Sequence, residues 1–165
     1  MKKLNLLSVL IIYIFCISCN KDKNESQIQI SGITETDITG ILIGSVDTTD
    51  WRFNDTWNQN VENLFIKNNN EPTDKVLPQS YLAIGYPNPS KSIMEFYFHS
   101  DSSMYYDFRI VDSNLKVIIQ LDSLKSGFAL QGDTKFAKGI LYRLYYKIYS
   151  TNKVYRGHGD FEFIN

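Results

Sequence analysis

Two histidines, His99 and His158, are the side chains best suited to acid–base or metal chemistry near neutral pH. Neither has a second histidine or a cysteine at metal-ligand spacing, so the sequence does not support a zinc site. In Gly157-His158-Gly159-Asp160 a base could lie beside a carboxylate, but adjacent residues of a strand face opposite sides and no G-x-S-x-G motif accompanies the run. We therefore predict no catalytic residue, and interpret the run as a glycine-flanked bulge that leads into the last strand.

Four aspartates lie close together in the first third of the chain: Asp37, Asp47, Asp50 and Asp55. Paired carboxylates can bind Ca²⁺ or act as acid and base. They lack the D-x-D-x-D-G loop pattern, however, and aspartate is common at turns and helix starts for capping alone. We predict no metal and no cofactor, and any calcium would be expected in this segment.

A predicted strand over residues 140–149 presents a row of charged and aromatic side chains on its outward face, with Arg143, Tyr145 and Tyr149 among them. Such a row could bind a glycan or a peptide, because rings stack on sugar faces and arginine supplies directed hydrogen bonds. Cross-strand pairing within the sheet is the alternative explanation. These three residues are the candidate ligand surface.

The positions of the cysteines separate the leader from the rest of the chain. Lys2 and Lys3 precede an apolar run over residues 6–17, which has the layout of a secretory signal peptide and is too short to span a bilayer. Cys16 and Cys19 are the two cysteines of the chain, so a protein cleaved after Ser18 would have no internal disulfide.

The sequence Cys16-Ile17-Ser18-Cys19 resembles a bacterial lipoprotein lipobox. The resemblance implies cleavage between Ser18 and Cys19, with covalent diacylglycerol and N-acyl lipid on Cys19. An ordinary signal peptide is the alternative. Two or more acyl chains give stable membrane attachment where one chain is marginal. We expect an exported protein, anchored by lipid in the cell envelope and most simply in the outer membrane. The acidic residues after Cys19 weakly resemble the surface-export signal of Bacteroidota lipoproteins.

Composition agrees with one or two small globular domains: 165 residues, 43% apolar and 21% charged. The formal charge is −1, and loss of residues 1–18 would leave fifteen basic and eighteen acidic residues, a charge of −3. Nucleic acid is therefore not an expected partner, because no basic field exists to release counterions from phosphates.

Strand patterns dominate the body of the chain. In the C-terminal half, alternating or β-branched runs predict strands over residues 93–98, 105–111, 116–121 and 140–149, and a last strand holding Phe161 and Phe163. Short turn-rich spacing indicates an antiparallel sandwich. Before it, residues 26–31 and 38–46 are predicted as strands. A helix of about ten residues is expected around Trp57, Val61, Leu64 and Phe65, with Thr56 and Gln59 as a capping box.

Three runs lie in the order found in one known family: Tyr86-Pro87-Asn88-Pro89, the segment 108–117, and Lys138-Gly139-Ile140-Leu141-Tyr142. Together they resemble the immunoglobulin-like C-terminal domain of type IX secretion cargo, over about half of the chain. The resemblance implies a β-sandwich that an outer-membrane translocon recognises for sorting. Independently, the two prolines and Asn88 predict a fixed bend before a strand, with a structural role.

These observations predict a mainly β protein. Its segments are a signal peptide (1–18), a lipidated tether (19–26), an N-terminal strand and helix region (27–75) and a β-sandwich (78–165). The expected function is that of a non-catalytic envelope lipoprotein whose sandwich mediates interaction, assembly or sorting. The alternative is a glycan- or peptide-binding accessory module of a surface uptake system. Its expected partners are the membrane, reached through the lipid, and an envelope protein or glycan.

Overall fold

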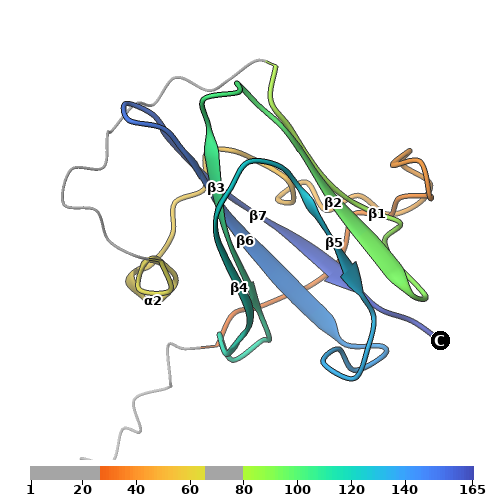
Figure 1. Cartoon of the computed structure of the whole chain (residues 1–165). Helices are drawn as coiled ribbons and strands as arrows, with labels where there is room; N and C mark the ends of the chain where they lie inside the picture. Colours follow the sequence, from red (N-terminus) through yellow and green to blue (C-terminus); the bar gives the residue numbers. More distant parts are fainter. Residues whose placement is uncertain (1–26, 66–79) are drawn as a thin grey trace, which may run out of the picture.

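The computed structural model describes residues 27–65 and 80–165. Within them two antiparallel sheets face each other and form a β-sandwich (Figure 1). The smaller sheet has the order β1-β2-β5 and the larger one β4-β3-β6-β7. The strands are β1 (Leu82–Tyr86), β2 (Ile93–His99), β3 (Tyr105–Val111), β4 (Val117–Leu124), β5 (Phe128–Gln131), β6 (Leu141–Tyr149) and β7 (Val154–Glu162). The antiparallel sandwich expected from the sequence is confirmed.

Alternation along the strands builds the core. On β2, Met94, Phe96 and Phe98 point inward and are almost fully buried, while the residues between them are exposed. The inward faces of β3 and β6 supply the opposite wall of the same apolar cluster, with Phe108 and Tyr146 at its centre. Because both inner faces are aromatic, burial of this surface is the main source of stability.

The order of the strands differs from that of a constant-type immunoglobulin domain in one respect. In that order the fourth strand closes the sheet made by the first, second and fifth strands. Here β4 pairs with β3, from Phe108 with Leu121 to Val111 with Val117, and so extends the larger sheet. The larger sheet therefore has a broad outer face over β3, β6 and β7, and the N-terminal segment packs on it.

The N-terminal strand predictions are wrong. The structure has no regular strand in residues 27–31 or 38–46. Within these ranges, Leu42 forms an isolated β-bridge with Thr36. Residues 35–46 instead make a short hairpin, with Glu35 N donating to Ser45 O and Asp37 N to Ile41 O. The apolar residues of 38–46 predicted a buried strand face, but their aliphatic side chains face solvent.

The predicted helix exists but is shorter. Helix α2 covers Gln59–Glu62, and its N-cap is Asn58, whose side chain accepts from Val61 N, in place of the expected Thr56. Trp57, Val61 and Phe65 are buried as the spacing predicted, and they pack with Val111 and Tyr145 of the larger sheet. We call this segment, residues 57–65, the α2 plug. Its packing on the larger sheet, more than the propensity of so short a helix, holds it in place.

The predicted leader, Ser18, Cys19, the tether and the polar break at 68–73 lie outside the described residues. In the described part of the chain, no helix has the length and apolar character that crossing a bilayer would require.

Candidate functional site

The edge of β7 is covered by a segment that arrives from more than a hundred residues earlier. Trp51 N donates to His158 O (2.7 Å) and Asp55 N donates to Arg156 O (3.0 Å), beside a parallel bridge between Asn54 and Arg156. The segment satisfies backbone groups of an edge strand that would otherwise face water. It also brings two of the clustered aspartates next to the histidine motif of β7.

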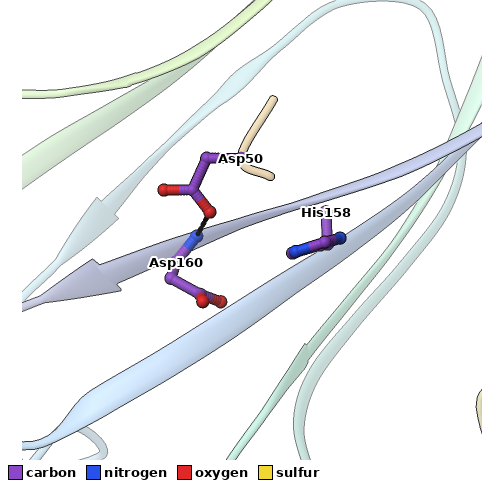
Figure 2. A group of neighbouring side chains, drawn as sticks. All are labelled: Asp50, His158 and Asp160. Atoms are coloured by element: carbon purple, nitrogen blue, oxygen red, sulfur yellow. Dashed lines mark hydrogen bonds between the residues drawn. The ribbon is translucent and has the colours of Figure 1, made fainter. Parts of the chain in front are cut away.

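Asp50, His158 and Asp160 form the centre of a polar cluster (Figure 2). One oxygen or nitrogen atom of each lies within 4.8 Å of the others, and Asp50 and Asp160 are buried. The expectation that the strand would separate the histidine from its aspartate is wrong. His158 and Asp160 are two residues apart, so they share one face of β7.

Asp160 is paired with Arg143 of the neighbouring strand β6. Arg143 Nε donates to Oδ1 and Nη2 to Oδ2, both at 2.6 Å, and the Asp160 side chain is fully buried. Burial raises the pKa of Asp160, and the guanidinium acts against that rise. For Arg143, burial favours the neutral form, but the hydrogen bonds and charge of Asp160 raise its pKa above the usual value. The pair is a bidentate ion pair that ties β6 to β7.

Asp50 is the most perturbed carboxyl of the cluster. Desolvation, and then the nearby charge of Asp160, raise its pKa from 3.8 to about 7. Its Oδ1 accepts from Asp160 N and its Oδ2 accepts from Thr34 N and Thr34 Oγ1, each at 3.0 Å. These bonds connect three segments of the chain, so Asp50 serves to hold the N-terminal segment on β7.

The three side chains do not suit a metal ion as they stand. Both oxygens of Asp160 accept from Arg143, and both oxygens of Asp50 accept from Thr34 or from Asp160 N. A cation would have to displace a guanidinium whose charge repels it. We assign no metal to this cluster.

The chemistry of a hydrolase is also incomplete. His158 Nδ1 contacts Asp55 Oδ2, which is how a carboxylate orients a catalytic imidazole. The other ring nitrogen, Nε2, is buried and has no hydrogen-bond partner in the described structure, so no hydroxyl or thiol of the described residues is positioned as its nucleophile.

A cavity of about 440 Å³ lies beside the cluster, between the α2 plug and the outer face of β6 and β7. Arg143 and Tyr145 line it, together with Arg52, Trp57 and His158. Tyr149 does not, and instead bonds to Asp107 and Ser123. The prediction that these three residues form one outward ligand surface is therefore wrong. Tyr145 is only 4% exposed, because the Trp57 ring packs edge-on against it with the ring centroids 5.6 Å apart.

The Tyr86-Pro87-Asn88-Pro89 bend has the structural role that the sequence predicted. The Asn88 side chain is fully buried; its Nδ2 donates to Thr34 O and Asp160 O, and its Oδ1 accepts from Glu162 N. It thus joins the bend to Thr34 and β7, the two segments that Asp50 also bonds.

Comparison with family models matches no family, and no similar protein is found among curated proteins or solved structures.

Proposed function

We propose that this protein is a non-catalytic lipoprotein of a bacterial cell envelope, anchored by acyl chains on Cys19 in the outer membrane, whose β-sandwich mediates interaction or assembly. The observation that carries the proposal is the order of residues in the leader: Lys2 and Lys3, then the apolar run 6–17, then Ser18-Cys19. The alternative, an ordinary secreted protein, would be released from the membrane.

The structure supports the non-catalytic part of the proposal through its hydrogen bonds. The charged groups that could have formed an active site, Asp50, Arg143 and Asp160, bond to one another or to backbone groups. Side chains engaged in this way strengthen the fold, and these three are not available to a substrate as acid or base.

The resemblance to the type IX sorting domain makes sorting the second form that this interaction could take. Sorting predicts removal of the C-terminal sandwich after export, and assembly predicts that it is retained. The two differ by residues 78–165, so the mass of the protein on the cell distinguishes them.

Two comparisons test the proposal. The Cys19→Ala protein should remain unprocessed or leave washed membranes, whereas Cys16→Ala should be cleaved and retained like the wild type. Processing at the same bond and membrane retention of the Cys19→Ala protein would refute the proposal.

A second candidate function, binding of a glycan or peptide, is favoured by the cavity. Its wall contains an exposed arginine, Arg52, and two nitrogen atoms that are buried and unpartnered among the described residues, Trp57 Nε1 and His158 Nε2. Trp57 Nε1 is a donor and would be satisfied by an acceptor on a ligand, whereas the role of His158 Nε2 depends on the tautomer of the ring.

Arg52→Gln is the sharpest variant for this second function, because Arg143 and Tyr145 also hold the fold. A glycan array and a peptide library should show binding by the wild type that falls at least tenfold in Arg52→Gln, with unchanged unfolding. Equal binding by both proteins, or none by either, would exclude the cavity as the site.

A further inference from the structure

The hairpin over residues 35–46 displays an unusual amount of apolar surface. Its five large aliphatic side chains are exposed to between 52% and 78%: Ile38, Ile41, Leu42, Ile43 and Val46. Single exposed aliphatic residues are ordinary on a protein surface, but five of them within residues 38–46 indicate an interaction site or an aggregation hazard.

The turn of the hairpin is held in one shape. Asp37 Oδ1 accepts from Thr39 N (2.8 Å), Thr39 Oγ1 (2.7 Å) and Ile41 N (3.0 Å). These bonds lower the pKa of Asp37, so the carboxylate keeps its charge and its acceptor role over the physiological range. At the tip, Gly40 has φ +81°, a conformation that favours glycine.

The base of the hairpin is fixed to the sandwich. Thr36 N donates to Asn88 O (2.8 Å), Asn88 N donates back to Thr36 O (3.1 Å), and Thr36 Oγ1 donates to Gly85 O (2.9 Å). Gly40 lies against the side chains of Ile84 and Tyr86 of β1. A rigid element loses little conformational entropy when it binds, so its exposed aliphatic residues are preorganised for a partner.

The charge of the segment favours one class of partner. Glu35, Asp37 and Asp47 are acidic and partly exposed, and the sequence has no lysine or arginine between Ile33 and Asp50, which is itself buried. Segments that insert into bilayers usually carry basic residues toward anionic headgroups, and this one would be repelled by them. An apolar protein surface with a basic rim would be complementary.

The position of the hairpin also favours a protein partner over the bilayer. This step rests on the proposed function, in which Cys19 carries the membrane anchor. Residues 19–26 reach at most about 28 Å, at about 3.5 Å per residue. The described chain begins at Gln27, beside Asn114 in the turn between β3 and β4. Figure 1 shows the hairpin, in orange, beside β1, and the start of the described chain, in red, below β4 on the opposite side of the molecule. Anchoring at Cys19 would therefore attach the membrane to the end of the molecule opposite the hairpin.

We propose that the 35–46 hairpin is a docking element whose exposed aliphatic side chains insert into an apolar groove, rimmed by lysine or arginine, on another envelope protein. The contact requires neither the cavity nor the polar cluster. A second copy of this chain and the bilayer are the competing occupants, and the test below separates them.

Site-specific photo-crosslinking of the full chain in the cells that produce it tests the proposal. A benzophenone amino acid replaces Ile41 or Ile43, and a control protein carries it at Gln120, an exposed position on β4. We expect a discrete protein adduct from both hairpin positions and none from Gln120. Mass spectrometry of the adduct should identify a crosslinked partner segment of apolar residues flanked by lysine or arginine.

The charge requirement has its own matched pair. Glu35 accepts from Ser45 N (3.2 Å), a bond that Glu35→Gln preserves. Glu35→Lys should lower the adduct yield at least threefold, with Glu35→Gln between it and the wild type. The double variant Ile41→Ser/Ile43→Ser should unfold like the wild type, because both side chains are exposed, and should yield no adduct from a crosslinker at Leu42.

An adduct with lipid, an adduct of twice the chain mass, a partner segment without basic residues, or no adduct would each overturn the proposal. Failure of the anchor is distinguishable from failure of this contact. An unacylated protein that still crosslinks at Ile41 refutes the proposed function alone, and an acylated protein that does not crosslink refutes the docking element alone.

Discussion

Replacement of Asp50 by asparagine should remove most of the pH dependence of stability between pH 5 and pH 7. Asp50 is 8% exposed, and desolvation and the Asp160 charge raise its pKa from 3.8 to about 7. The folded state therefore holds a proton that the unfolded chain has already released. This contribution to stability is fully present below about pH 4 and is lost as the pH rises to about 7.

The size of the effect follows from the same two values. A tenfold change in proton affinity is worth about 1.4 kcal/mol, so the full loss is at most about 4 kcal/mol, of which about 2 to 3 kcal/mol falls between pH 5 and pH 7. Asp37 and Asp47 have lowered pKa values from hydrogen bonds to Thr39 and Thr49. Their contributions are lost only as the pH falls below about 4, so they do not mask the effect.

Urea unfolding at pH 5, 6, 7 and 8 measures this dependence, and the fluorescence of Trp51 and Trp57 reports on the segment concerned. Asp50→Asn should give a much flatter profile, whatever its absolute stability, and the slope that remains belongs to Asp160, whose pKa burial also raises. Thr34→Val is the matched control, because it removes a hydroxyl bond to Asp50 but keeps the titrating carboxyl. A wild-type protein whose stability rises between pH 5 and pH 7, or an Asp50→Asn protein with the wild-type slope, would refute the reasoning.

Three further substitutions test the packing around the cluster. Arg143→Met should destabilise the protein by about 3 to 5 kcal/mol in urea unfolding, because it leaves the Asp160 carboxylate buried without its partner. Adding Asp160→Asn to this variant should restore part of the lost stability. No recovery in the double variant would contradict the pairing. Gly159→Ala should lower the free energy of unfolding by about 1 to 3 kcal/mol, because the added Cβ would overlap the Trp51 ring. Gly32→Ala is the control: its Cβ would meet no atom within 4 Å, and its stability should stay within about 0.5 kcal/mol of the wild type. Equal thermal shifts for the two variants would contradict the packing of Trp51. Trp57→Ala should lower the free energy of unfolding by about 3 kcal/mol, because it removes the ring contacts with Phe65 and Tyr145. Trp57→Phe should lower it much less, because it keeps a ring and the indole N–H has no hydrogen-bond partner to lose. Similar unfolding midpoints for both variants would contradict this role of the ring.

Five of the seven strands of the sandwich could be predicted because each has a clear local pattern, whereas no range was predicted for β1 or β5. The strand 105–111 was predicted with the bounds that the structure has, and the inward residues of β2 and β6 follow from simple alternation. Each of these strands has an apolar face, and the opposite sheet covers that face. Local pattern and tertiary burial agree, so propensity alone is sufficient.

The hairpin and the polar cluster could not be predicted in the same way. Ile41, Leu42 and Ile43 form an apolar run typical of a strand, yet all three are exposed, and a sequence pattern cannot report whether a partner face exists. Asp50 and Asp160 are separated by 110 residues, so their contact depends on where the whole N-terminal segment crosses β7. One local signal was available: the spacing of two between His158 and Asp160 places both on one face.

The intact mass of the protein in the washed membrane fraction tests the central claim most directly. We expect a chain that begins at Cys19 and carries the added mass of a diacylglyceryl group and an amide-linked acyl chain. A chain that still contains residues 1–18, or one that begins at residue 19 with an unmodified thiol, would contradict the assignment of this protein as a lipid-anchored envelope component.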